Sequence, residues 1–103
     1  MAAKLYWTPL AREDLFEIYS LIGADSPAAA ENILGAIEAQ IEMLASYPRM
    51  GARHPEIRRS VRILVEYPYL ILYETKPDAD RGVIEAVSIV RIVDGRRDLT
   101  RLV

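Results

Sequence analysis

Cysteine is absent from this chain of 103 residues, and histidine, tryptophan and phenylalanine each occur once. The lack of cysteine excludes disulfides, thiolate nucleophiles and cysteine-ligated zinc, and it fits a reducing, cytoplasmic setting. The sole histidine, His54, lies in an arginine-rich segment, where neighbouring cations do not orient it as a base. There is no glycine-rich phosphate loop followed by a helix. We therefore predict no catalytic triad, no metal and no cofactor.

Long hydrophobic runs are missing as well. No apolar run approaches the roughly 20 residues that a helix needs to cross a bilayer, and residues 1–14 lack the apolar centre of a secretory signal. We expect no membrane partner. A composition of 51% hydrophobic and 27% charged residues is typical of a soluble globule. The length predicts a single domain over residues 1–103.

The net charge of −2 combines an acidic first half with a basic second half. Residues 1–48 carry a net −5 and residues 49–103 a net +3, with acids interleaved among the bases. A nucleic-acid surface would need a clear local excess of bases, so we expect no direct sequence-specific nucleic-acid binding. Arginine outnumbers lysine here, which favours bidentate recognition of carboxylate or phosphate, and an acidic protein segment would also satisfy such a surface.

Two helices are predicted in the first half. Thr8-Pro9 and Ser26-Pro27 each combine a capping side chain with a proline suited to the first helical position. Apolar residues then recur with helical spacing up to Gly23 and up to about Tyr47. A link of about three residues between the two helices predicts a helical hairpin.

Strands are predicted at residues 4–7, 61–65, 69–74 and 83–93, with a loop at residues 49–60. The last three strands are joined by connections of hairpin length, which predict antiparallel pairing. The fold class is therefore α+β, with the order β-α-α-β-β-β and an antiparallel sheet packed on the N-terminal helical hairpin.

Arginines and tyrosines are the candidate binding residues. Arg62 and Arg91 project from strands, where a carboxylate such as Glu66 or Glu85 is expected to hold them, whereas Arg96 and Arg97 are the stronger functional candidates. Tyr69 and Tyr73 share one strand face, which suits either cross-strand packing or docking of a partner. For the acids early in the first helix, a solvated face is favoured over an acid–base pair; these acids are Glu13, Asp14 and Glu17.

Taken in order, these motifs resemble the RelE/ParE toxin superfamily of bacterial type II toxin–antitoxin systems. The resemblance spans nearly the full length of the chain. Its motifs are Thr8-Pro9-x-Ala11-x-x-Asp14-Leu15-x-x-Ile18, Ser26-Pro27-x-x-Ala30, Leu44-x-x-x-Pro48-x-x-Gly51, Pro55-Glu56-x-Arg58, Tyr69-x-Ile71-x-Tyr73 and Ile89-Val90-Arg91-Ile92-Val93-Asp94-Gly95-Arg96-Arg97-Asp98.

Within the superfamily, the residues favour the ParE-like branch of gyrase poisons over the RelE-like ribosome-dependent nucleases. The sheet arginine of the nucleases falls at Leu70, and their C-terminal tyrosine falls near Val103, although Arg97 matches a nuclease arginine. Few groups remain to activate a ribose hydroxyl, so the resemblance implies no catalytic residues. The common ParE-like ending has a histidine where Asp94 stands.

The resemblance implies a cognate ParD-like antitoxin and DNA gyrase as partners, in a plasmid-stabilisation module that causes growth arrest. Antitoxin contacts are expected at Tyr69, Leu70 and Tyr73. Target contacts are expected at the arginines Arg58, Arg59, Arg62, Arg91, Arg96 and Arg97. Two alternatives stay open: a RelE-type messenger RNA endoribonuclease, and a degenerate, non-toxic antitoxin-binding module.

Overall fold

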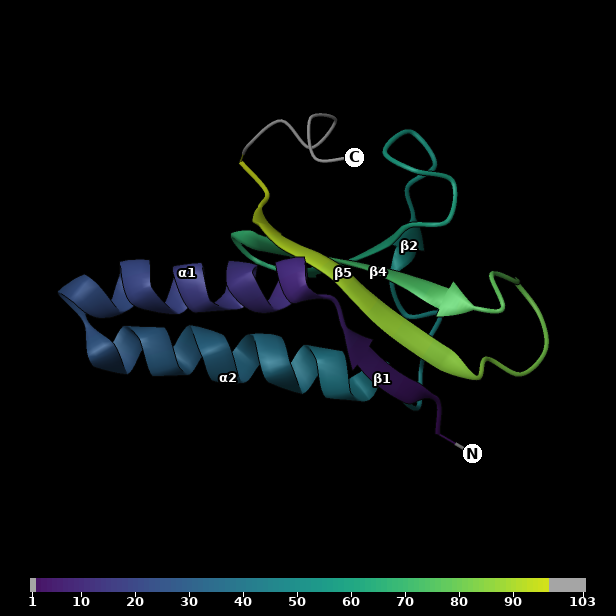
Figure 1. Ribbon diagram of the computed structural model, residues 1–103, viewed down its shortest axis with the longest axis horizontal. Coiled ribbons are helices and arrows are strands. Elements are labelled where there is room, and N and C mark those ends of the chain that lie inside the picture. Colours follow the sequence, from purple (N-terminus) through teal and green to yellow (C-terminus); the bar gives the residue numbers. More distant parts are fainter. Residues whose placement is uncertain (1, 97–103) are drawn as a thin grey trace.

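The computed structural model describes residues 2–96, which form a helical hairpin beside a five-stranded sheet (Figure 1). Helix α1 is Pro9–Asp25 and helix α2 is Pro27–Met43. Thr8 and Ser26 cap the two helices through their hydroxyl oxygens, as the sequence predicts, and each cap is followed by a proline. The single residue Ser26 separates the helices, so the link is shorter than expected. Within residues 2–96, neither helix is both long and apolar enough to span a membrane.

The sheet has the order β1-β5-β4-β3-β2. Its strands are β1 (Lys4–Trp7), β2 (Ala52–Arg53), β3 (Arg62–Glu66), β4 (Tyr69–Lys76) and β5 (Ala86–Asp94). The antiparallel meander β3-β4-β5 is confirmed. Strand β1 instead pairs in parallel with β5, so the sheet is mixed. The predicted loop at residues 49–60 contains β2, whose two residues are too few to give a periodic signal.

The helical hairpin covers one face of the sheet, and residues 54–60 lie toward the other. Side chains alternate along β4, so Tyr69, Ile71 and Tyr73 join the helix-facing core while Leu72 joins the opposite cluster. An irregularity at Leu72/Tyr73 shifts the pairing with β5. The cluster on the far face comprises Val61, Ile63, Leu72 and Val93, with Ile57 and Leu70 packed against it.

Helix α1 completes the edge of β5 where β1 ends. The amide of Thr8 donates to the carbonyl of Ile89, and the Thr8 hydroxyl donates to the carbonyl of Val90 at 2.9 Å. Six residues further along, Oδ2 of Asp14 accepts a hydrogen bond from the amide of Ile92 at 2.9 Å. Side chains of the helix thus replace a missing strand, because buried backbone amides need a partner.

Candidate functional site

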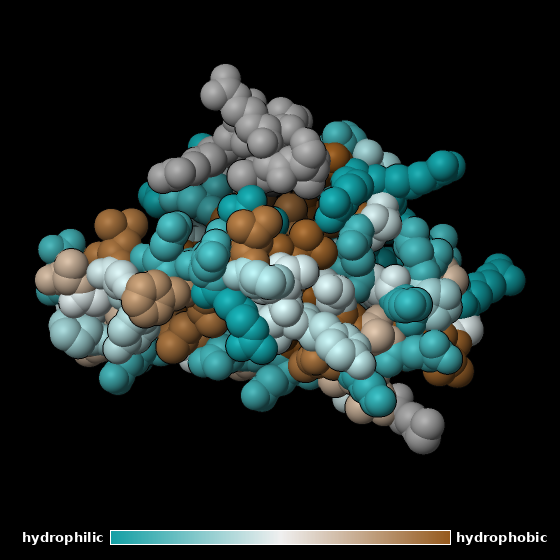
Figure 2. All heavy atoms as spheres, in the orientation of Figure 1, coloured by the Kyte–Doolittle hydropathy of each residue, from teal (hydrophilic) through white to brown (hydrophobic). Residues whose placement is uncertain are grey.

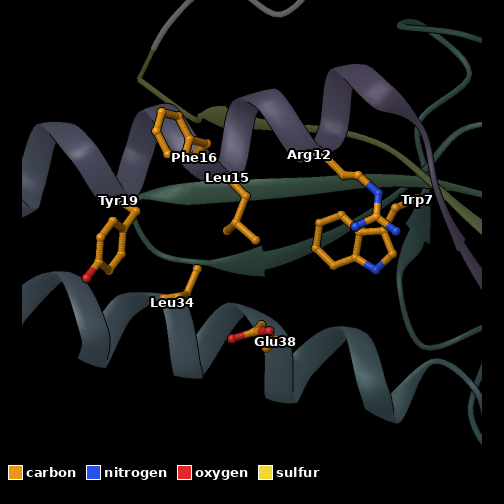
Figure 3. A pocket seen from close by; sticks show the side chains of 7 residues that line it. All are labelled: Trp7, Arg12, Leu15, Phe16, Tyr19, Leu34 and Glu38. Carbon is orange, nitrogen blue, oxygen red and sulfur yellow. The ribbon is translucent and has the colours of Figure 1, made fainter.

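An apolar groove lies between α1 and α2 (Figure 3). In this view Leu15, Tyr19 and Leu34 lie between the two helices, Phe16 lies over α1, and strands pass behind them. The groove has a volume of about 470 Å³, and the guanidinium of Arg12 lies 6.0 Å from the ring centre of Trp7 at one end. Phe16 is 71% exposed. The lining residues are Trp7, Arg12, Leu15, Phe16, Tyr19, Leu34 and Glu38.

The single phenylalanine, Phe16, is the sign of this groove in the sequence, but helical periodicity alone does not show whether its side chain is exposed. Phe16 lies outside the apolar stripe that faces the sheet, which includes Ala11 and Ile18. Hydrophobic side chains therefore remain exposed over the helical hairpin, as Figure 2 shows. Large exposed apolar side chains that line one groove are typical of an interaction surface.

Asp14 is buried, with 9% of its surface exposed, so the predicted solvated face is wrong at this position. Its carboxylate forms a bidentate ion pair with Arg91, with distances of 2.8 Å to Nε and 2.9 Å to Nη2. This hydrogen bonding raises the pKa of Arg91. The expected carboxylate partner of Arg91, Glu66 or Glu85, is also wrong. Arg91 therefore fastens α1 to β5.

Arg62 is 6% exposed and is likewise bound by residues far along the chain. Its Nη1 donates to the carbonyl of Gly51 at 3.0 Å and its Nη2 to Asp80 at 3.2 Å. The expected partners Glu66 and Glu85 are again not the ones used. Strand periodicity cannot identify Asp80 as the partner of Arg62. Asp80 lies in the connection between β4 and β5, and only the tertiary fold brings this connection next to Arg62.

The expected antitoxin contacts lie at different depths. Tyr73 is fully buried: its hydroxyl accepts from the amide of Gly51 at 2.8 Å and donates to the carbonyl of Pro48 at 2.9 Å. Burial raises the pKa of Tyr73. Tyr69 is 8% exposed under the helices, and Leu70 is half-buried on the far face of the sheet.

Arginines converge on the acidic connection between β4 and β5. Arg53 contacts Asp78 at 2.8 Å through Nη1 and Asp80 at 2.9 Å through Nε, and Arg62 shares the same Asp80 oxygen. The hydrogen bond from Arg53 lowers the pKa of Asp80. Asp78 and Asp80 are not among the candidates that the sequence predicts.

The C-terminal end of β5 carries a second bidentate pair. Asp94 accepts from Nε of Arg96 at 2.9 Å and from Nη2 at 2.7 Å, and this hydrogen bonding raises the pKa of Arg96. The Arg96 side chain is 65% exposed. Arg97 lies outside the described residues. The amide of Gly95 donates to the carbonyl of Pro68 at 2.8 Å, which fixes this end beside the β3–β4 turn.

The other two arginine candidates lie in the segment before β3. Arg58 is exposed and its Nε lies 3.4 Å from Glu74 of β4, and Arg59 is exposed. Among residues 2–96, no group of three or more histidine, aspartate or glutamate side chains is arranged to hold a metal ion. The surface as a whole offers arginines and an apolar groove, which are the means of protein recognition.

The sequence model of ParE toxins of type II toxin–antitoxin systems of the parDE type matches residues 5–99. This chain belongs to the ParE toxin family. It is 33% identical over 79 residues to Y4kP of Sinorhizobium fredii (strain NBRC 101917 / NGR234), which is named as a candidate toxin; the match covers 75% of this chain and 80% of Y4kP.

A solved structure of the chromosomal ParDE toxin–antitoxin system from P. aeruginosa contains a chain with the same fold. The TM-score is 0.68 at 25% identity, and the alignment covers 90% of this chain and 96% of the other. The predicted membership of the ParE-like branch and the predicted α+β fold class are thus confirmed. Membership of a toxin–antitoxin family implies a ParD-like antitoxin as partner.

Proposed function

We propose that this ParE-family toxin poisons DNA gyrase in the cytoplasm, blocks replication and is neutralised by a cognate ParD-like antitoxin in a plasmid-stabilisation module. The proposal rests on the apolar environment of Leu70. This position corresponds to a sheet arginine in the related nucleases, and here an apolar side chain packs against the cluster that contains Leu72 and Val93. An apolar group cannot donate or accept a proton, so general acid–base cleavage of RNA loses a participant at this position.

The test compares the purified protein in two assays. We expect it to inhibit gyrase supercoiling and to accumulate cleaved DNA, while a cell-free translation reaction keeps its messenger RNA intact. Cleavage of messenger on ribosomes without any effect on supercoiling would assign the chain to the nuclease class. Inactivity in both assays together with tight antitoxin binding would indicate the degenerate module.

The proposed target surface consists of Arg58, Arg59 and Arg96, which are exposed, together with Arg97, which lies outside the described residues. Arg62 and Arg91 contribute by holding the sheet and α1 in place, since both are bound within the protein. Arg96 is paired with Asp94 while its side chain is 65% exposed, and an exposed ion pair of this kind exchanges readily for a partner carboxylate.

The double substitution Arg96→Glu with Arg97→Glu is expected to abolish toxicity while the domain still folds. Reversal of charge at the tail would repel the target surface that the arginines attract. Growth after induction measures toxicity, and thermal unfolding of the purified protein measures the fold. A charge-matched control, Lys4→Glu with Arg81→Glu, changes exposed residues elsewhere and should stay toxic. Retained growth arrest by the tail variant would remove the C-terminal arginines from the target site.

For the antitoxin, we propose the groove between α1 and α2 as the binding surface, because Tyr69 and Tyr73 are buried under the helices. The groove residues Trp7 and Leu15 pack against the helix-facing core that contains Tyr69 and Tyr73, while Phe16 is 71% exposed and available to a partner. An amphipathic segment that folds on binding suits such a groove, because its apolar residues recur on one helical face.

Phe16→Glu is expected to weaken antitoxin binding by about 2 kcal/mol, or roughly 30-fold in Kd, which is the effect of losing an aromatic anchor. Calorimetric titration with the antitoxin encoded beside this gene would measure the change. Leu21→Glu is the matched control, since Leu21 is 73% exposed on the same helix but does not line the groove. Equal affinities for the two variants would contradict placement of the antitoxin in the groove.

A further inference from the structure

Three arginines from separate segments bind the β4–β5 connection. Arg49 follows α2, Arg53 belongs to β2 and Arg62 to β3; we call these three residues the arginine cradle. The connection that they bind, residues 77–82, is called the acidic loop. The two carboxylates of this loop, those of Asp78 and Asp80, form ion pairs with Arg53 at 2.8 and 2.9 Å.

Arg49 donates hydrogen bonds to the backbone of the acidic loop. Its Nε donates to the carbonyl of Ala79 at 3.0 Å, and its Nη2 donates to the carbonyl of Gly82 at 2.8 Å. The cradle thus recognises two kinds of oxygen at once: carboxylates two residues apart and the carbonyls of the same segment. That combination is found in an acidic peptide and not in a nucleic-acid backbone.

Arg62 of the cradle is buried, whereas the carboxylates of the acidic loop are exposed. Arg62 is 6% exposed and is anchored to the carbonyl of Gly51. In contrast, the Asp78 and Asp80 side chains are 39% and 77% exposed, and exposed ion pairs are weak because water screens them. Val83, which follows the loop, is 77% exposed and adds little apolar burial. The loop carboxylates are therefore open to replacement by the carboxylates of a partner segment that makes the same contacts.

The loop also leaves part of the cradle unused. Within residues 2–96, Nε of Arg62 is a buried donor for which no hydrogen-bond partner is found. A buried donor without a partner is unfavourable, so a better-fitting anionic group would gain from filling it. Beside the cradle, an apolar hollow of about 600 Å³ is shared through Arg49 and could receive apolar side chains next to an acidic segment; it is lined by Met43, Tyr47, Pro48, Arg49 and Met50.

We propose that the arginine cradle is a binding site for an acidic peptide segment of a partner protein, and that the acidic loop occupies this site in place of the partner. The partner segment carries two carboxylates about two residues apart and an apolar residue beside them. Binding exchanges the loop for the segment. The site is distinct from the groove between α1 and α2 and from the tail arginines, so it does not depend on gyrase being the target.

The test uses a fluorescein-labelled synthetic peptide with the sequence of the acidic loop, PDADRG, at low ionic strength. We expect the full-length variant Asp78→Asn with Asp80→Asn to bind this peptide at least about tenfold more tightly than the unmodified protein, because the competing occupant is weakened. Adding Arg53→Gln to the variant should remove the gain. The control Asp25→Asn with Glu31→Gln makes the same charge change at exposed positions on the helices and should bind like the unmodified protein.

Equal peptide binding by the loop variant and the control, or no binding by the loop variant, would overturn the proposal. A single-stranded oligonucleotide that displaces the peptide more effectively than an unlabelled peptide of equal charge would assign the cradle to nucleic acid and overturn it as well. A second measurement uses the unmodified protein alone. A saturating concentration of unlabelled peptide should speed hydrogen exchange at the amides of residues 78–82, and an unchanged rate would count against displacement of the loop.

Discussion

Replacing Asp14 with alanine is expected to destabilise the protein by about 3 kcal/mol, because the change leaves the charge of Arg91 without its partner inside the structure. It also leaves the amide of Ile92 without its acceptor at the edge of β5. For a domain of this size, such a loss lowers the melting temperature by roughly 12–20 °C. Thermal and denaturant unfolding of the purified protein would measure it.

Glu13→Ala is the matched control for Asp14→Ala. Glu13 precedes Asp14 on the same helix and is exposed, so its loss should change the free energy of unfolding by no more than about 0.5 kcal/mol. The double variant Asp14→Ala with Arg91→Ala should be less destabilised than the sum of the two single changes, because neither charge is then left alone. Additive effects would show that the ion pair does not couple α1 to β5.

Replacing Tyr73 with alanine is expected to cost about 4 kcal/mol in the free energy of unfolding. Removal of a fully buried aromatic ring leaves a cavity in the helix-facing core. The hydroxyl also satisfies Gly51 and Pro48, whose segment approaches so closely that a Cβ on Gly51 would lie 2.7 Å from Cε1 of the ring. This tyrosine therefore fixes the segment between α2 and β2 onto the sheet.

Tyr73→Phe separates the two contributions, because it keeps the ring and removes the hydroxyl. We expect it to cost about 1–2 kcal/mol, from the unpaired amide of Gly51 and carbonyl of Pro48. Tyr67→Ala serves as the control, since Tyr67 is 77% exposed and its removal should be nearly neutral. Urea unfolding of the three variants gives the comparison, and a neutral Tyr73→Phe would contradict a structural role for the hydroxyl.

The periodic parts of the fold were predictable because their signals are local. The capping pairs Thr8-Pro9 and Ser26-Pro27 predict the start of each helix, and the β-branched runs predict the strands. Strand β2 was not predictable, since two residues have no period, and the helix-capped edge of β5 depends on Asp14 meeting a strand 78 positions away.

The candidate site was likewise predictable where its signals are local and not where it depends on contacts between distant residues. The sequence pointed to arginine as the recognition chemistry, and Arg58, Arg59 and Arg96 do lie exposed. It also indicated that carboxylates of the protein hold Arg62 and Arg91, but it could not identify Asp80 and Asp14 as those carboxylates, because the partners are distant in sequence. The groove was missed for a related reason: whether Phe16 is covered depends on what packs above the helices.

By itself, the sequence determined the order of the elements, the helical hairpin, the antiparallel meander and membership of the ParE toxin family, because these depend on local propensities and on motifs in a fixed order. The tertiary structure alone decided which charges are paired inside the protein and which are exposed. That decision depends on contacts between residues far apart in the chain, such as Asp14 with Arg91 and Asp80 with Arg53 and Arg62. No local pattern encodes such pairs, since each side chain finds its partner only when the sheet and helices have come together.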